Sequence, residues 1–422
     1  MKFLFISEAG DGVGIAYRVA QGGNEVAVWI KDDEASKRGN GLVEKVHDWE
    51  FELSDNMIVV SDCTGSGLLC DALRESRYQV IGGSQVMDRL EMDRNFAQKV
   101  MSEAGLATPK SKHFTDWDKA FDLVREHEER LVFKPEGDLS GVVPSYVSES
   151  QEDLLEMMEI FRSRSPMAKP EFTIQEFVDG VCVSTECWFN GVDFVKGMFN
   201  HTLERKQLMC GDLGPSGGCT GNVVWAARQD SVLVDQLLKL RPFLQEERYC
   251  GPIDINTVVS ESGIYGLEFT PRFGYDATPT LFYELLDGPV DEVLLNIAAG
   301  LAPTFGLRSG YAAGIRLSLS PWPAEKYHGP EGVPIRGLGR SPFEHLCFCD
   351  VMENKDGQLC TSEGYGIVGV ATGYGGSIDE AFAEAYKIAN KAQIPEKQMR
   401  MDLAEVFKKD MRRLNRILGE FD

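Results

Sequence analysis

The chain has 422 residues and a formal net charge of −23 at pH 7. This surplus of acid excludes a general basic surface for nucleic acid, because phosphate binding needs clustered Lys and Arg, although it leaves room for a local basic pocket that binds a small anion. With 43% apolar and 10% aromatic residues, the chain can build hydrophobic cores and is not disordered. Its length exceeds what a single core usually sustains, so we expect about two to four domains.

No apolar run approaches the roughly 18 residues of a membrane span, and residues 1–6 predict a first strand rather than a signal peptide. The ten cysteines are scattered without a CxxC spacing, which favours a reducing compartment. We therefore expect a cytoplasmic monomer or small homo-oligomer. Its partners are expected to be small-molecule substrates, and neither nucleic acid nor a membrane.

Residues 1–92 alternate between predicted strands and helices. Strands are expected at residues 2–6, 25–30, 57–60 and 79–81, and helices within 11–21 and at 68–76. This is the βαβ pattern of an open parallel sheet, and we treat residues 1–92 as the first domain.

Three further parts follow along the chain, at residues 93–190, 191–305 and 306–422. The second part predicts helices at 94–103 and 151–163 and strands at 131–134, 173–177 and 183–189. The third part holds a glycine-rich segment and an acidic hairpin. The fourth predicts a β-rich domain that ends in helices at 378–389 and 401–418.

The first glycine cluster, Gly10, Gly12 and Gly14, follows the first predicted strand and opens a helix. Backbone amides at a helix N-terminus can bind an anion. Asp32 and Asp33 end the second strand, where a dinucleotide-binding domain carries its ribose-binding acid. A nicotinamide oxidoreductase is therefore one alternative, and a tight strand–helix turn without a ligand is the other.

Lys134 ends an apolar strand just before the flexible loop at residues 137–141. A lysine in this position can hold ATP phosphates while the loop closes. Further on, residues 175–180 end a strand and turn at Gly180 into the next one. An extended backbone offers an acceptor and a donor to adenine, and we expect Glu176 and Val178 to supply them.

Residues 211–221 are rich in glycine and proline. We expect a loop whose backbone can approach a ligand closely. His201 lies just before this loop, where it is either a structural residue or a substrate contact.

Two short runs, residues 251–256 and 267–272, alternate acidic and apolar residues and predict antiparallel strands joined by the polar turn 260–263. Such a hairpin would hold Asp254 and Glu268 on one face. Two carboxylates side by side suit Mg²⁺, which prefers oxygen ligands and shares them with substrate phosphates. Arg272 could then bind a phosphate in a bidentate way. The alternative is an edge hairpin with solvated acids.

The order of Lys134, residues 175–180, Asp254 and residues 268–272 resembles the ATP-grasp ligases, and among them the family of phosphoribosylamine–glycine ligases. The likeness covers nearly all 422 residues. Residues 131–137 resemble the family's VVKADG strand, residues 214–218 its GPNTGG loop and residues 267–274 its IEFNxRFG segment. The resemblance implies a multidomain α/β and α+β protein with an ATP-grasp fold, an N-terminal open parallel sheet and a C-terminal β-rich domain.

The resemblance also implies cofactors, ATP with Mg²⁺ or Mn²⁺, and a reaction, ADP-forming ligation of a carboxylate to an amine through an acyl phosphate. Residues 93–190 and 191–305 would then be the two halves of the ATP-grasp unit. The implied roles are catalysis by Lys134 and Arg272, ATP binding by Arg94, Lys134, Glu176, Val178 and Asp179, metal binding by Asp254, Glu268 and Thr270, and substrate binding by Gly214, Ser216, Gly217, Gly218 and Asp276.

Several positions depart from the family pattern. Thr270 stands where the family has a metal-binding Asn, and Arg94 replaces a phosphate-binding Lys. Cys182 falls where a ribose-binding Glu is expected, so Asp179 or Glu186 would take that role.

Residues 12–16, 61–66 and 275–278 depart further, because they keep little of the family's acceptor-side motifs. We therefore expect the ligase chemistry to be retained and phosphoribosylamine to be a poor acceptor, with drift inside the ordinary family as the alternative. A weakened ATP-grasp protein that only binds or regulates is a further alternative.

Overall fold

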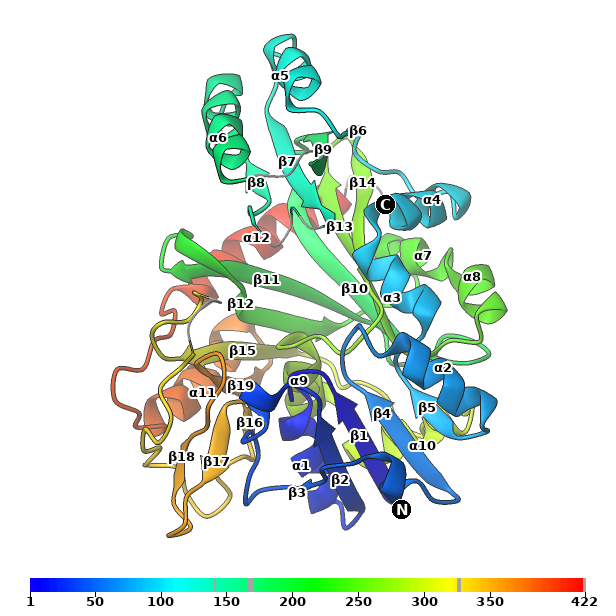
Figure 1. The fold of residues 1–422 in the computed structure, drawn as a ribbon, viewed down its shortest axis with the longest axis vertical. Coiled ribbons are helices and arrows are strands. Elements are labelled where there is room, and N and C mark those ends of the chain that lie inside the picture. The colour runs from blue at the N-terminus through cyan, green and yellow to red at the C-terminus, as the bar shows by residue number, and fades with distance from the viewer. Residues whose placement is uncertain (138, 140–141, 166–169, 325–327, 420–422) are drawn as a thin grey trace.

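The computed structural model describes residues 1–422 except 138, 140–141, 166–169, 325–327 and 420–422. Figure 1 shows three main sheets: a small one at the top, a long one across the middle and a parallel one below. None of the helices in the described ranges is long and apolar enough to cross a membrane.

The N-terminal sheet is parallel and has the order β3-β2-β1-β4-β5, as predicted. The central strands β1 and β4 are buried almost throughout, which explains why they are nearly continuous apolar runs, whereas the edge strand β3 is polar and partly exposed. The strands are β1 (Lys2–Ser7), β2 (Glu25–Ile30), β3 (Glu44–Lys45), β4 (Met57–Ser61) and β5 (Gln79–Ile81), and the helices are α1 (Val13–Gln21), η1 (Asp33–Ala35), η2 (Glu50–Glu52), α2 (Gly67–Glu75) and α3 (Gln85–Met92).

The small sheet has the order β6-β9-β7-β8 and supports two helices on one face. Phe133, Phe172 and Trp117 stack in the core below these helices. Because side chains alternate along a strand, this packing turns Lys134 away from the core. The elements are α4 (Arg94–Glu103), β6 (Ser111–Phe114), α5 (Trp117–Arg125), β7 (Leu131–Glu136), β8 (Tyr146–Val147), α6 (Gln151–Arg164) and β9 (Glu171–Glu176).

The large sheet has eight strands in the order β14-β13-β10-β11-β12-β15-β19-β16. The strands are β10 (Val181–Asn190), β11 (Asn200–Met209), β12 (Leu213–Ala226), β13 (Cys250–Ser260), β14 (Gly263–Thr270), β15 (Tyr311–Ser318), β16 (Leu346–Phe348) and β19 (Ile367–Gly375). This sheet takes strands from both sides of residues 190 and 305, so the four-part division of the chain stays a prediction.

Helices flank the large sheet, and a separate two-stranded sheet of β17 (Val351–Glu353) and β18 (Leu359–Thr361) lies beside it (Figure 1). The helices are α7 (Val232–Leu238), α8 (Arg241–Glu246), α9 (Ala277–Thr280), the π-helical turn η4 (Leu281–Leu285), α10 (Val290–Ala298), α11 (Ile378–Lys391) and α12 (Leu403–Leu418). The expected C-terminal helices therefore form within two residues of their predicted ends.

The prediction of a loop at residues 211–221 is wrong, because β11 and β12 form a long hairpin with a turn at residues 210–212. The glycines serve packing and irregular pairing instead. A Cβ on Gly217 would lie 2.3 Å from the Trp322 ring, and one on Gly221 would lie 2.3 Å from Leu403 of α12. The ladder also shifts register between Arg205 and Met209, where β-bulges form.

Candidate active site

The acidic hairpin forms as predicted, with β13 and β14 paired antiparallel. Asp254 lies opposite Thr270 and Asn256 lies opposite Glu268, so Asp254 and Glu268 are diagonal neighbours on one face. The Asn256 side-chain amide donates to Asp254 Oδ1 at 3.1 Å and to the Thr270 hydroxyl at 3.4 Å. Asn256 thus joins two predicted metal residues, a link that spacing alone did not reveal.

More carboxylates share this face of the large sheet. Glu186 of β10 pairs directly with Asp254, and Glu204 of β11 lies on the same face. Burial, with Glu204 nearby, raises the pKa of Glu186 to about 8. Burial beside both glutamates also raises the pKa of Asp254 well above its usual value. A buried cluster of this kind is stabilised by a cation.

Arg272 follows the hairpin and is already held by other residues. Its guanidinium bonds Glu91 at 3.0 Å, donates to the carbonyl of Phe273 at 2.9 Å and lies 4.1 Å from the centre of the Tyr275 ring. Its charge also acts on Asp254 and Glu186. In this structure Arg272 therefore acts on the acidic cluster as a fixed positive charge.

Lys134 of β7, in the small sheet, and Lys206 of β11, in the large sheet, both interact electrostatically with the hairpin. Burial, with a smaller contribution from Arg94, lowers the pKa of Lys134 to about 8, and Glu268 opposes that shift. Burial alone would lower the pKa of Lys206, but Glu268 and Glu204 raise it. Both ammonium groups therefore lie within electrostatic range of Glu268. Lys206 was not predicted, because nothing in its local sequence marks it.

The other predicted phosphate residue, Arg94, lies at the start of α4 and approaches Glu136 of β7, with 3.9 Å between Nε and Oε1. Glu136 also accepts from Thr173 and lies 3.2 Å from His113 Nδ1. Arg94 and Lys134 influence each other electrostatically, so the structure brings them to one region. In the predicted phosphate loop 137–141, residues 138, 140 and 141 lie outside the described residues.

The predicted adenine residues lie at the crossover from β9 to β10. The Glu176 amide donates to the carbonyl of Lys110 at 2.9 Å, and the Asp179 carboxylate pairs with Arg413 of α12 at 2.8 Å. Glu176, Val178 and Asp179 line a cavity of about 580 Å³ beside the tip of the acidic hairpin. Asp179 thus has another partner, whereas Glu186 lies in the acidic cluster and Cys182 lies near Lys134 and Lys206.

The predicted substrate residues divide into two groups. Gly217, Gly218 and Asp276 line a cavity of about 510 Å³, whereas Gly214 and Ser216 are exposed on β12 and do not line it. Aromatic side chains form much of the wall, so we call this space the aromatic cavity. Its main lining side chains are Tyr275, Asp276, Arg316, Trp322, Phe348 and Tyr365.

His201 is a structural residue and does not face a ligand. It is buried in β11, with Thr185 Oγ1 3.0 Å from Nδ1 and Ser231 Oγ 3.3 Å from Nε2. Burial lowers its pKa to about 4, so the ring is neutral near pH 7.

A metal ion fits this site only with help from a substrate. Among the described residues no three Asp, Glu, His or Cys side chains converge on one metal position. The Glu186 Oε1 atom is nevertheless buried without a hydrogen-bond partner in the described structure, which leaves a carboxylate oxygen for a cation. Asp254 and Glu268 supply two more, and Mg²⁺ usually completes its shell with water and phosphate oxygens.

Comparisons with known proteins show which family and which fold the chain is similar to. Residues 92–278 match the family described as "Phosphoribosylglycinamide synthetase, ATP-grasp (A) domain". The phosphoribosylamine–glycine ligase of Streptococcus pyogenes is 24% identical over 359 residues, which cover 79% of this chain and 83% of that protein.

Solved structures extend the likeness to almost the whole chain. The crystal structure of phosphoribosylamine–glycine ligase from Thermotoga maritima has a TM-score of 0.71 and 21% identity, and covers 95% of this chain and 100% of its own. The biotin carboxylase domain of the Hydrogenobacter thermophilus 2-oxoglutarate carboxylase, in complex with MgADP, ADP and bicarbonate, has a TM-score of 0.63 and 13% identity over 94% of this chain and 91% of its own.

The fold and these matches define the chain as a protein with the ATP-grasp fold, built on an N-terminal parallel sheet and a large antiparallel sheet. Within that class it resembles phosphoribosylamine–glycine ligase.

Proposed function

We propose that this chain is an ATP-dependent, ADP-forming ligase that joins a carboxylate to an amine. The carboxylate oxygen attacks the γ-phosphorus of ATP, which gives an acyl phosphate and ADP. The amine nitrogen then attacks the acyl carbon, the bond to the phosphate oxygen breaks, and phosphate leaves as the amine loses its proton. The observation that carries the proposal is that Lys134 and Lys206 both interact electrostatically with Glu268, which shares a face of the acidic hairpin with Asp254.

Phosphoryl transfer needs aligned phosphates and neutralised charge more than covalent help. Lys134 lies on the small sheet, Arg94 at the start of α4 and Lys206 on the large sheet. Between them they offer three positive charges to a polyphosphate. Their placement on separate sheets would hold the phosphates between the two halves of the fold.

Asp254 and Glu268 would hold Mg²⁺, with Thr270 or Asn256 beside them. The bound ion supplies charge neutralisation on the phosphates. Its charge also favours the ionised form of Asp254, which burial otherwise opposes. Manganese would fit the same oxygen ligands.

The end of β9 would bind the adenine through the backbone of Glu176 and Val178. The cavity beside this segment supports that role. Asp179 is the weaker candidate for the ribose, because Arg413 already pairs with it.

The relatives named phosphoribosylamine–glycine ligase support a ligase of purine biosynthesis with small-molecule substrates. The identity of the carboxylate and of the amine, a cytoplasmic location and a monomeric or small homo-oligomeric state stay predictions. The alternative of a nicotinamide enzyme is weakened, because the Gly12 amide that would bind a cofactor phosphate at the start of α1 already donates to the carboxylate of Asp62 at 2.6 Å.

A screen of carboxylate and amine pairs for ADP release tests this proposal. Glycine with freshly generated phosphoribosylamine belongs in the screen. We expect at least one pair to raise ADP release above the rate with ATP alone, and only in the presence of Mg²⁺ or Mn²⁺. No stimulation by any pair, with MgATP still bound, would favour the alternative of a protein that only binds or regulates.

A further inference from the structure

The aromatic cavity lies beside the acidic cluster on the same face of the large sheet. Arg316 of β15 shares that face with Glu204, and Asp276 and Arg316 both act electrostatically on Glu204. The cavity, of about 510 Å³, is in the range of small-molecule pockets. A ligand bound there would lie next to the reacting phosphate.

The cation in the cavity wall is already paired. Arg316 Nε donates to Asp276 Oδ2 at 3.1 Å, and a second, short contact joins the same two groups. Its third donor, Nη1, reaches the carbonyl of Gly217 at 3.0 Å. The guanidinium face lies 5.3 Å from the centre of the Trp322 ring. Arg316 therefore links the residues of the cavity wall, and few of its hydrogen-bond donors remain free to bind a phosphate.

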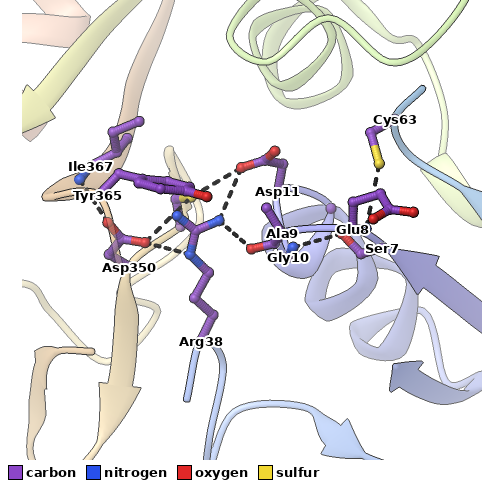
Figure 2. Close-up of polar contacts among 12 residues, drawn as sticks. Ser7, Glu8, Ala9, Gly10, Asp11, Arg38, Cys63, Asp350, Tyr365 and Ile367 are labelled. Atoms are coloured by element: carbon purple, nitrogen blue, oxygen red, sulfur yellow. Dashed lines mark hydrogen bonds and ion pairs between the residues drawn. The ribbon is translucent and has the colours of Figure 1, made fainter. Parts of the chain in front are cut away.

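A second arginine behind the wall is paired in the same way (Figure 2). Arg38 is 0% exposed, and its guanidinium contacts Asp350 at 2.5 Å, Asp11 at 3.0 Å and the carbonyl of Ala9. The ring of Tyr365 covers it, with 5.1 Å between the Arg38 Cζ and the ring centre. The guanidinium joins the N-terminal loop to the segment after β16.

The charges in and behind this wall therefore favour a cation over an anion. Three carboxylates, those of Asp11, Asp276 and Asp350, face two guanidinium groups, so one negative charge is left over. In the described ranges no lysine lines the cavity. A phosphate group is bound through unpaired Arg or Lys side chains, and this wall offers none.

The remaining wall suits a flat apolar body. Trp322 lies against the backbone of Gly217, where a Cβ would stand 2.3 Å from the ring. Tyr275, which is 48% exposed, and the half-buried Tyr365 add further aromatic surface, whereas Phe348 is buried. Aromatic faces attract both apolar rings and ammonium groups.

We propose that the aromatic cavity binds the amine substrate, and that this substrate is an unphosphorylated primary amine with a flat, apolar or aromatic body. The inference rests on the proposed ligase function and gives the class of its acceptor. The amine binds as an ammonium ion near Asp11, stacks on the aromatic wall, and loses its proton before it attacks the acyl phosphate.

Calorimetric titration with tyramine and with tyramine O-phosphate tests the proposal, because the two probes differ only by the phosphate group. We expect tyramine to bind at least about tenfold more tightly than the ester. Trp322→Ala should weaken tyramine at least fivefold, whereas Phe51→Ala, at an exposed position of η2, should leave it unchanged. Tyr275→Ala serves as a second variant, and circular dichroism checks that each variant is folded.

A gain of function sharpens the test. Ile367 lines the cavity, so Ile367→Lys places an unpaired cation there and should shift the preference toward the ester by at least fivefold. Tighter binding of the ester by the wild-type protein, equal binding of both probes, or no binding of either would overturn the proposal. MgATP is titrated into the same samples: loss of amine binding with ATP retained defeats only this inference, whereas absence of ATP binding defeats the proposed function.

Discussion

The acidic hairpin and the aromatic cavity lie on the same face of one sheet, but they differ in whether their charged side chains are paired with each other. Around Asp254 and Glu268, carboxylates lie close together, and among the described residues neither Lys134 nor Lys206 forms an ion pair within 4 Å. Around the aromatic cavity, Arg316 pairs with Asp276 inside the fold. The charges of the first region would be neutralised only by bound ligands, whereas those of the second region are largely neutralised by ion pairs within the fold.

This difference matches the pattern of likeness to the ligase family. By the motif resemblance, the hairpin side is predicted to keep the residue types that phosphoryl transfer needs. The same resemblance predicts that the cavity side has exchanged its ligand-facing groups. A binding site that is changed in this way alters which substrate is accepted without altering the chemistry.

The largest effect is expected at Glu268, and it would test the first half of the comparison. Glu268→Gln removes one charge from the proposed metal position and should raise the activation free energy by about 2–4 kcal/mol, which lowers turnover roughly 30- to 900-fold. The measurement is the rate of ADP release with the most active substrate pair. Glu25→Gln, at the exposed start of β2 in the N-terminal sheet, is the matched control and should keep wild-type activity. Equal rates for the Glu268→Gln variant and the wild type would remove Glu268 from the metal role.

A variant at His201 tests whether this buried part of β11 contributes to stability alone and not to ligand binding. Its pKa is lowered to about 4 in the fold from an ordinary value of 6.5, so the neutral ring is favoured by the folded state. This contribution to stability is present above pH 6.5 and is lost as the pH falls from 6.5 to 4. The loss is on the order of 3 kcal/mol.

The His201→Gln variant should lose that acid dependence while it keeps its affinity for MgATP. Urea unfolding at several pH values between 4 and 7 measures it. An unchanged pH slope would show that another group dominates the acid response.

Lys134→Ala tests whether the acidic hairpin and the aromatic cavity bind their ligands independently. Loss of a charged hydrogen-bond donor to phosphate costs about 1.5–3 kcal/mol, so MgATP affinity should fall roughly 10- to 150-fold. Tyramine affinity should not change. The reverse holds for Trp322→Ala, which should leave MgATP affinity within about twofold of wild type. If both variants weakened both ligands alike, the two regions would be one site.

The smallest effect is expected at Thr270. Thr270→Asn provides an amide oxygen, a better ligand for Mg²⁺ than a hydroxyl, and should lower the Mg²⁺ concentration needed for half-maximal ADP release a few-fold. The Asn256 amide now bonds the Thr270 hydroxyl, so Asn256→Ala serves as the companion variant. No change in either variant would place the metal elsewhere on the hairpin.

The sequence alone predicted the parallel N-terminal sheet and the acidic hairpin, because both depend on local alternation and on turn residues. Lys134 was found for the same reason, as a single charge at the end of an apolar strand. The roles assigned to the site residues stay predictions that the variants above will test.

The sequence could not reveal contacts that depend on the register of a whole sheet. Lys206 and Glu204 reach the hairpin only because β11 pairs with β10, which in turn pairs with β13. The glycines at 214–221 predicted a loop because Gly is rare inside strands. Gly217 and Gly221 instead accommodate the close approach of Trp322 and Leu403, which lie about 100 and 180 residues further along the chain, and Gly214 and Gly218 have positive φ angles. Asn256 was passed over because its partners lie on the neighbouring strand.

Transfer of oxygen from substrate to phosphate tests the central claim of ATP-driven carboxylate activation most directly. With the most active carboxylate labelled with ¹⁸O in its carboxyl group, attack on ATP and later loss of phosphate must carry one labelled oxygen into inorganic phosphate. Mass spectrometry of the released phosphate should show this label in proportion to ADP formed, and Glu268→Gln should reduce both together. Unlabelled phosphate released at the full rate of ADP formation would contradict an acyl phosphate and the ligase mechanism with it.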